Sequence, residues 1–270
     1  MISFLNSTSS RLILVDFGYF SFTAIYAHIK NRTIPPTKLA LSMLAANLRN
    51  VAIMPEDIVI IAVDSSLGSW RKEIDVNYKA DRKVKRQKEE IDWSSIFGRF
   101  RHLLDYLDYN SPFHIIEVEK CEADDIIAIA CKKFSDKKCI VISTDSDFEQ
   151  LIAYPNVLLF SPKSKKYKEV KNPYKIIASK IKKERTDNLV SPILTQEDYE
   201  KRNSIINLLT LPNNIVQAVS EKLVAFPKKE WNFDSFPFWN LIPRFQNMYN
   251  NESHVPKKKK RKKEQNQLTL

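Results

Sequence analysis

The chain has 270 residues, 43% of them hydrophobic, and a formal net charge of +11. This length and apolar content suffice for a buried core in one large domain, or in one domain with a small appendage. Its three glycines, Gly18, Gly68 and Gly98, cannot form a phosphate-binding Walker loop or a dinucleotide-binding fingerprint, which argues against nucleotide-driven chemistry.

Apolar runs of strand length alternate with amphipathic segments of helix length between residues 11 and 160. We expect strands at 12–15, 58–63, 113–118, 139–143 and 157–160. We expect helices at 36–51, 93–107 and 123–134. This alternation predicts an α/β fold with a mostly parallel central sheet flanked by helices.

The character of the sequence changes after residue 172, where helical patterns continue without strand-like runs. We expect helices at 173–181, 196–209 and 212–223, with a polar turn at 182–188. Within 225–249, the aromatic residues Trp231, Phe233, Phe236, Phe238, Trp239 and Phe245 predict a clasp that folds back onto the body. The chain therefore divides into an α/β domain (1–170), a smaller helical region (171–255) and a charged tail (256–270) that we expect to be disordered.

Acidic residues gather mostly where predicted strands end. They are Asp16, Asp64, Glu122, Asp124, Asp125, Asp145, Asp147, Glu184 and Asp187. Each cluster alone has an ordinary explanation, because acids are favoured in the first turn of a helix and as helix caps. Together they predict one crevice, since parallel strands end at one edge of a sheet. Like charges there raise one another's pKa, and a divalent cation removes that penalty. We infer a magnesium site in a protein that acts on phosphodiesters.

A basic segment at 78–88 has six basic residues against the single acid Asp81. A solvated helix face is one explanation. Alternatively, Lys79 and Arg82, at i and i+3, grip a phosphate and stabilise charge on its oxygens. Further candidates for DNA contact, by charge or by base stacking, are Arg71, Lys72, Tyr78, Lys83, Lys85 and Arg86.

These motifs in this order resemble the flap endonuclease and 5′-to-3′ exonuclease superfamily. The resemblance rests on Asp16, Asp64, the 70–72 and 78–83 segments, and the acidic motifs at 122–125 and 143–148. It extends over about residues 11–249, and the branch that it most resembles is that of the phage ribonuclease H enzymes. It implies an α/β fold of the PIN and 5′ nuclease type, in which residues of about 70–92 form an arch.

The resemblance also implies two magnesium ions, for which manganese can substitute. The first ion would be held by Asp16, Asp64, Glu122, Asp124 and Asp145, directly or through water. The second would be held by Asp145, Asp147, Glu184 and Asp187, with Asp125 in the outer shell. Lys79 and Arg82 would engage the scissile phosphate, and the product end would be a 5′-phosphate.

The chain departs from this family after residue 188. No glycine follows Gly98, and residues 194–199 resemble a stretch that in the phage enzymes lies well beyond the helix-hairpin segment that holds duplex DNA. We therefore expect a shortened helix-hairpin within the helical region.

The tail suggests partners. Residues 257–263 carry +7 and Glu264 carries −1, which leaves +5 on residues 1–256. Such a tail would neutralise phosphates, and it also resembles a nuclear localisation signal. Residues 265–270 resemble peptides that dock on sliding clamps, with an unstructured end as the alternative. A single-strand-binding protein is a further candidate partner, and we expect a monomer.

The proposed activity is a structure-selective 5′ nuclease that removes RNA primers with adjacent DNA, or short 5′ flaps, from lagging-strand fragments. One alternative is a single-site ribonuclease of the PIN type. The other is a non-catalytic DNA- or clamp-binding protein that retains the fold. Three cysteines without metal-ligand spacing and the lack of a membrane-length apolar run predict a soluble, intracellular protein. The resemblance to the phage enzymes implies the cytoplasm of a phage-infected host cell.

Overall fold

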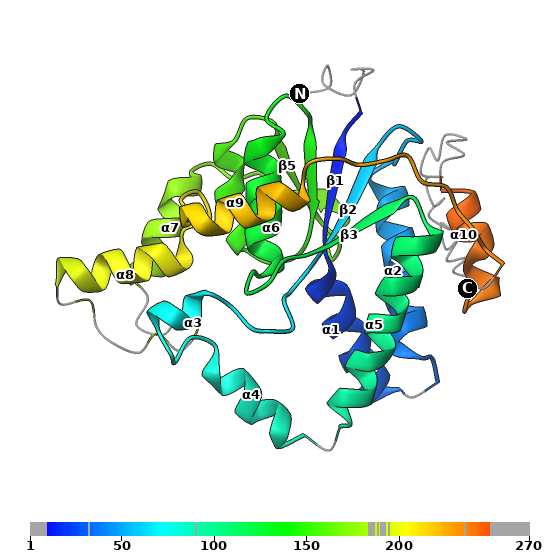
Figure 1. The fold of residues 1–270 in the computed structure, drawn as a ribbon, viewed down its shortest axis with the longest axis horizontal. Helices are drawn as coiled ribbons and strands as arrows, with labels where there is room; N and C mark the ends of the chain where they lie inside the picture. The colour runs from blue at the N-terminus through cyan, green and yellow to red at the C-terminus, as the bar shows by residue number, and fades with distance from the viewer. Residues whose placement is uncertain are drawn as a thin grey trace, which may run out of the picture.

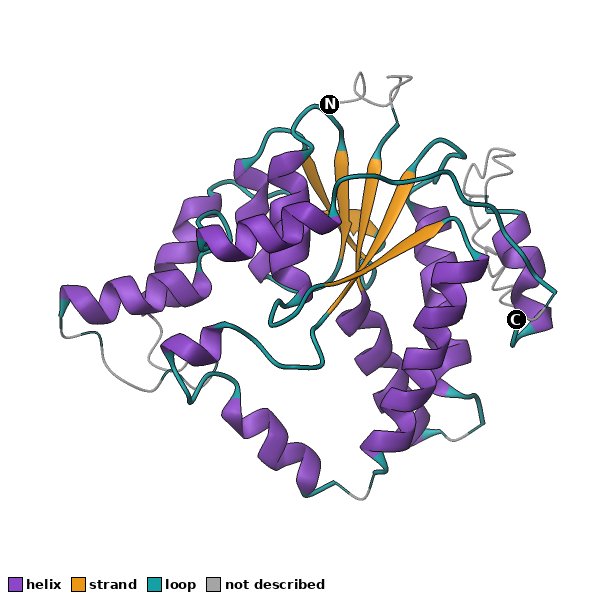
Figure 2. Ribbon diagram, in the orientation of Figure 1, coloured by secondary structure: helices purple, strands orange, loops and turns teal. Residues whose placement is uncertain are grey.

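A six-stranded sheet forms the centre of the protein in the computed structural model (Figure 1). The structure describes residues 10–31, 33–89, 91–182, 187, 189, 193, 195–234 and 236–248. The strands are β1 (Leu12–Asp16), β2 (Ile58–Val63), β3 (Phe113–Glu117), β4 (Cys139–Ile142), β5 (Val157–Ser161) and β6 (Lys166–Tyr167). Their order is β3-β2-β1-β4-β5-β6, with β6 antiparallel to β5 and every other pair parallel. Figure 2 shows helices on both faces, so the predicted α/β architecture is confirmed.

The central strand β1 is buried on both faces. Ile13 and Val15 point into one hydrophobic cluster, while Leu12 and Leu14 point into the other. A continuous apolar run is what a parallel strand covered by helices on both sides requires. Because β1 lies between β2 and β4, the chain order reverses next to β1, and such a reversal opens a crevice at the carboxyl ends of the strands.

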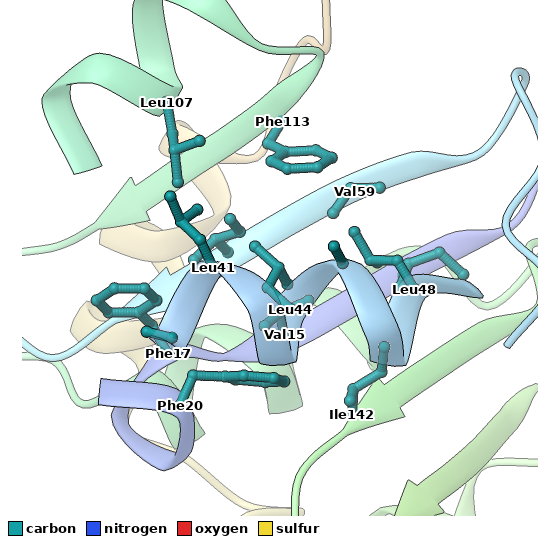
Figure 3. Close-up of a cluster of buried hydrophobic side chains, with 14 of the residues drawn as sticks. Val15, Phe17, Phe20, Leu41, Leu44, Leu48, Val59, Leu107, Phe113 and Ile142 are labelled. Atoms are coloured by element: carbon teal, nitrogen blue, oxygen red, sulfur yellow. The ribbon is translucent and has the colours of Figure 1, made fainter. Parts of the chain in front are cut away.

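One face of the sheet is covered by α1 (Phe17–Lys30), α2 (Pro36–Asn50) and α5 (Trp93–Asn110). Figure 3 shows Phe20, Leu44 and Leu48 among the side chains that fill the space between α2 and the sheet. The helix α1 was not predicted, because its aromatic-rich sequence has no simple helical periodicity. Its start is set by Asp16, whose carboxylate accepts a hydrogen bond from the backbone N–H of Tyr19.

The predicted aromatic clasp is confirmed on this same face. It ends in η3 (Trp239–Leu241) and α10 (Ile242–Gln246). The Trp231 ring lies 5.2 Å from the ring of Phe113 and 4.8 Å from that of Phe245, which ties the C-terminal segment to β3. Trp239 lies outside the clasp, because its side chain is 79% exposed.

The other face is covered by α6 (Ala123–Lys133), η2 (Asp147–Ala153) and α9 (Asn213–Lys222). Beside them, α7 (Pro173–Lys182) packs against η2 and α8 (Gln196–Ile206). The helices predicted from 173 onward are thus confirmed within a few residues. The aromatic clasp and α9 share core clusters with the α/β domain. A third cluster lies mainly within the helical region and consists of Tyr78, Ile177, Ile181, Leu189, Ile205 and Ile206.

The basic segment contains two short helices, α3 (Arg71–Ile74) and α4 (Ala80–Gln87). Figure 1 shows this arch segment (residues 70–92) running from the side of α8 to the start of α5, beyond the carboxyl end of β1. The polar turn expected at 182–188 and the tail fall mostly or wholly outside the described residues. Among the described residues, no helix combines the length and the apolarity that a membrane crossing needs.

Candidate functional site

Asp16 stands at the centre of the carboxyl edge of the sheet. It ends β1, and its Oδ2 accepts a 2.7 Å hydrogen bond from the hydroxyl of Ser143, the residue that follows β4. This bond joins the ends of two neighbouring strands. Burial, with repulsion from the nearby carboxylates of Asp64 and Asp145, raises the pKa of Asp16 to about 6 against the opposing effect of its hydrogen bonds.

Asp64 follows β2 and faces the start of α6. Its Oδ1 accepts a 2.8 Å hydrogen bond from the backbone N–H of Ala123, the first residue of that helix. Burial raises the pKa of Asp64, and repulsion from Glu122 adds to the rise. A Cβ on Gly18 would lie 3.1 Å from Asp16 Oδ1 and 3.8 Å from Asp64 Oδ2. The glycine therefore keeps open the space beside these two carboxylates.

Asp124, in the first turn of α6, has the most strongly perturbed carboxylate of this edge. Burial raises the pKa of Asp124 well above its usual value, and repulsion from Asp16 and Glu122 adds to the rise, while Lys79 opposes it. Within the described residues, no hydrogen-bond donor satisfies this carboxylate. An ionised Asp124 therefore needs a cation more than its neighbours do.

Two further acids follow β4 at the same edge. The backbone N–H of Asp145 donates to the Ser143 hydroxyl at 3.1 Å, and that of Asp147 donates to Asp145 Oδ1 at 2.9 Å. These bonds shape the turn that leads into η2. The carboxylate of Asp147 pairs with Lys180 of α7. Asp145 is exposed and Asp147 is half-buried, so both are open to a ligand.

These carboxylates line a cavity of about 470 Å³ at the carboxyl edge of the sheet. Its lining consists of Asp16, Gly18, Tyr19, Phe22, Asp64, Lys79, Arg82, Glu122, Asp124, Ser143, Thr144, Asp145, Ser146, Asp147, Lys180 and Asp187. The structure therefore brings together seven of the predicted acids, from five segments of the chain. Glu184 lies outside the described residues.

The donor set fits a hard divalent cation, because carboxylate oxygens are the ligands that magnesium and manganese prefer. Among the described residues, however, no three acidic, histidine or cysteine side chains stand in a ligating arrangement. Three basic side chains lie between them instead. Lys79 bonds Glu122 Oε1 at 2.9 Å, Arg82 bonds Asp187 Oδ1 at 3.1 Å, and Lys180 pairs with Asp147. Entry of a cation would require these carboxylates to turn from their basic partners.

Asp125 is fully enclosed by donors and has no oxygen to offer an ion. Its Oδ2 accepts from the indole N–H of Trp70 and from Arg71 at 3.0 Å each, and from the backbone N–H of Glu122 at 2.9 Å. Its Oδ1 accepts from Arg71 at 2.7 Å. Asp125 thus lies behind the cavity, where it fixes the start of α6 and the base of the arch segment.

Arg71, expected on a DNA-binding surface, is instead only 1% exposed. Besides Asp125, its guanidinium donates to Glu122 Oε2 at 3.1 Å and to the carbonyl oxygen of Ile205 at 2.8 Å. The expectation is corrected for Arg71, because every direction of its planar fork is used inside the protein. The sequence could not show this, since the partners lie 54 and 134 positions away.

Tyr78 is likewise buried, with 4% of its surface exposed, so its predicted role in base stacking is also corrected. Its hydroxyl donates to Glu122 Oε2 at 3.0 Å. Glu122 thus receives bonds from Arg71, Tyr78 and Lys79. Burial raises the pKa of Glu122, but these partners, Lys79 first, hold it below its usual value. Glu122 is therefore ionised and joins the arch segment to the cavity.

The other predicted DNA-binding residues lie along the arch segment. Lys72 is exposed, Lys85 pairs with Asp81 at 2.8 Å, and the Arg86 guanidinium lies 5.9 Å from the centre of the Phe97 ring. Lys83 belongs to α4, but its side chain lies outside the described part.

Sequence reasoning missed several lining residues, of which Lys180, Ser143 and Gly18 matter most. Ser143 could have been suspected, because it is the last residue of a predicted strand and the first of the acidic motif at 143–148. Gly18 directly follows the Asp16 and Phe17 pair but has no signal of its own. Lys180 is brought into the cavity only by the packing of α7 against η2, which local sequence does not reveal.

Comparison with known proteins gives consistent matches. The family model described as 5′-3′ exonuclease, N-terminal resolvase-like domain, matches residues 11–184. Ribonuclease H of Enterobacteria phage T4 is 27% identical over 241 residues, which covers 82% of this chain and 79% of the relative. The 5′-3′ exonuclease of Mycoplasmopsis pulmonis (strain UAB CTIP) is 32% identical over 149 residues, or 54% of this chain and 46% of the relative.

Solved structures show the same fold. A phage T5 protein co-crystallised with metal ions has a TM-score of 0.58 at 14% identity, covering 79% of this chain and 98% of its own. The bacteriophage T5 flap endonuclease in a pseudo-enzyme-product complex with DNA and metal ions has a TM-score of 0.52 at 17% identity, covering 79% of this chain and 85% of its own.

We predict that Asp124→Asn stabilises the metal-free protein, by about 0.5–2 kcal/mol at neutral pH. Because the pKa of Asp124 is raised in the folded protein, its ionisation destabilises the fold. The free energy of unfolding therefore falls as the pH rises through that pKa. The gain should vanish at acidic pH, where the wild-type carboxyl is also neutral. Thermal unfolding in EDTA across pH measures this, with exposed Asp105→Asn as the control. Equal melting temperatures for wild type and Asp124→Asn at neutral pH would refute the prediction.

We predict that Arg71→Ala lowers the free energy of unfolding by about 3–5 kcal/mol, because it leaves the buried Asp125 carboxylate without its ionic partner. Denaturant titration measures the loss. The adjacent exposed Lys72→Ala is the matched control and should change stability by less than about 0.5 kcal/mol. Similar stability of the two variants would contradict the network described here.

Proposed function

The chain belongs to the 5′-3′ exonuclease family of nucleases, and from that premise we propose that it is a magnesium-dependent, structure-selective 5′ nuclease. In this proposal it removes RNA primers with adjacent DNA, or short 5′ flaps, from lagging-strand fragments. The observation that supports it most is the cavity in which Asp16, Asp64, Asp124 and Asp145 converge beside basic residues of the arch segment. Acids that can hold a metal and cations that can bind a phosphate are the groups that metal-assisted phosphodiester hydrolysis uses.

The activities and ligands of the similar proteins support the proposed substrate and the proposed metal ion. The phage T4 relative is a ribonuclease H, which favours RNA in a hybrid duplex as one substrate. A T5 flap endonuclease of the same fold was crystallised with DNA and metal ions, which favours a DNA partner and a divalent cation. Magnesium is the proposed ion, with manganese as a substitute, because every acidic ligand is a hard oxygen donor.

Two ions would share the carboxylates. Asp16, Asp64, Glu122, Asp124 and Asp145 would hold the first, directly or through water, and Asp145, Asp147, Glu184 and Asp187 the second. Bound there, the ions would supply an activated water and would neutralise charge on the phosphate and on the departing oxygen. Ser143 would orient Asp16 through the 2.7 Å hydrogen bond, so that one oxygen of that carboxylate faces the cavity.

Lys79 and Arg82 would move from carboxylates to the scissile phosphate. Both line the cavity, and their present partners, Glu122 and Asp187, are proposed ligands. Metal binding would compete for those carboxylates and so release the two cations toward an incoming phosphate. Hydrolysis would leave a 5′-phosphate on the downstream product. Lys72, Lys83, Lys85 and Arg86 would guide the 5′ strand along the arch segment, while Arg71 and Tyr78 would hold its base in place.

A non-catalytic DNA-binding protein with this fold is the second candidate. The three basic side chains that pair with Glu122, Asp147 and Asp187 would suit it, because they neutralise those acids without a metal. They leave Asp16, Asp64 and Asp124 with raised pKa values, however. These three carboxylates destabilise the fold when they ionise, and a protein that only binds DNA would not need them. Their presence therefore favours the enzyme.

The helical region (171–255), with its shortened hairpin, is proposed to hold duplex DNA. The basic tail would add phosphate contacts. The protein would act in the cytoplasm of a phage-infected cell. A sliding clamp would dock on residues 265–270. A single-strand-binding protein is a further proposed partner, and the enzyme is proposed to be a monomer.

Removing residues 265–270 should abolish stimulation by a clamp while sparing basal cleavage. Equal stimulation of the truncated chain would exclude that docking site.

We predict that Asp145→Asn lowers cleavage of a 5′-labelled flap and of an RNA-primed duplex by about a hundredfold or more, because Asp145 would serve both ions. Short 5′ products should appear with the wild type in magnesium and disappear in EDTA. The exposed Asp136→Asn, at the other edge of the sheet, is the matched control and should cleave normally. DNA binding by the wild type with no cleavage of either substrate would favour the non-catalytic candidate.

A further inference from the structure

A second concentration of positive charge, outside the arch segment, lies in residues 162–182. This stretch holds eight lysines and one acid, Glu169, for a net charge of +7. Residues 1–256 carry +5 in total, so the remainder of that range carries −2. The positive charge of the body is therefore concentrated in this stretch and in residues 78–88, rather than spread evenly over the surface.

Six of these lysines are exposed, and none of the six has an ion-pair partner among the described residues. They are Lys163, Lys165, Lys166, Lys171, Lys175 and Lys182, which we call the lysine surface. The other two are engaged, because Lys168 bonds Glu149 at 2.8 Å and Lys180 pairs with Asp147. Unpaired cations this close together repel one another, and their combined positive potential attracts an anion from solution.

The lysine surface adjoins the carboxylate-lined cavity. The strand β5 is parallel to β4, so its end at Ser161 lies on the same edge of the sheet as Asp145, and the turn to β6 projects from that edge. Two strand spacings separate β5 from β1, which is about 10 Å. The helix α7 carries Lys175 and Lys182, with Lys171 just before its start, and it also places Lys180 in the cavity.

Protection of the sheet edge accounts for only part of this pattern. Lysines on an edge strand prevent pairing with other chains, which suits Lys166 on β6. Lys171, Lys175 and Lys182 lie before, on and at the end of a helix, where no strand edge needs protection. A polyanion that runs past both the turn and α7 accounts for all six residues.

We propose that the lysine surface binds the phosphate backbone of duplex nucleic acid next to the cleaved bond. This inference rests on the proposed nuclease function. Duplex is favoured over single strand because the surface offers charge rather than a stacking platform. The Tyr167 ring packs against Phe160 at 5.4 Å, and only Tyr174, 65% exposed, stands free. At a rise of about 3.4 Å per base pair, the distance from β1 corresponds to about three base pairs.

Two triple variants test the proposal. One combines Lys163→Ala, Lys165→Ala and Lys166→Ala, and the other combines Lys171→Ala, Lys175→Ala and Lys182→Ala. Fluorescence anisotropy in EDTA measures binding to a 20-base-pair duplex and to a 20-nucleotide single strand over a range of NaCl concentrations. Each triple variant should weaken duplex binding about tenfold or more, and should reduce the slope of log K against log salt by about 2–3.

The matched control is a triple variant of exposed lysines near the opposite edge of the sheet, Lys132→Ala, Lys222→Ala and Lys228→Ala. It removes the same charge and should leave the salt slope within about 0.5 of the wild type. With a flap substrate and magnesium, the lysine-surface variants should lose kcat/KM mainly through KM. Unchanged circular dichroism melting curves would show that the variants fold.

Lysine-surface variants that bind duplex like the control variant would overturn the proposal, even if the protein is an active nuclease. A loss confined to the single strand would overturn the assignment to duplex. Loss of duplex binding in a protein that cleaves nothing would refute the proposed function and leave the lysine surface standing. The two failures are therefore distinguishable.

Discussion

Mutual repulsion among carboxylates at one edge of a parallel sheet is the constraint on which the rest of this structure depends. The strand order places Asp16, Asp64 and Asp145 at adjacent strand ends, and the start of α6 adds Asp124. Burial and proximity raise the pKa of Asp16, Asp64 and Asp124, so their ionisation at neutral pH costs folding stability. Such a cost is tolerated where the acids serve a function, and a divalent cation would offset it.

The basic residues around this edge have two distinct duties. Arg71 is buried, and its guanidinium joins α3, α6 and α8 by hydrogen bonds to Asp125, Glu122 and the Ile205 carbonyl. Lys79 and Arg82 instead stand at the cavity wall with carboxylate partners that a metal would claim. The buried network gives the arch segment a fixed base, whereas the cavity-facing pairs can open. Substrate phosphate and metal would therefore be coupled through the same carboxylates.

Much of this arrangement could be predicted from the sequence. Apolar runs with acids at their ends predict both a parallel sheet and the convergence of Asp16, Asp64 and Asp145, because parallel strands end at one edge. What failed were roles set by distant packing. Arg71 and Tyr78 look like surface residues in a basic segment, yet α8 and Glu122 bury them. Lys180 reaches the cavity only because α7 packs on η2, and the lysine surface depends on β6 turning back at the same edge.

The central claim is that these carboxylates hold divalent cations, and anomalous diffraction from crystals soaked in manganese tests it most directly. The account predicts two manganese peaks in the cavity, one against Asp16, Asp64 and Asp124 and one against Asp147 and Asp187, with Asp145 touching both. It also predicts that Lys79 and Lys180 move away from their present partners. Manganese bound elsewhere, with the cavity carboxylates still paired to Lys79 and Lys180, would contradict the account.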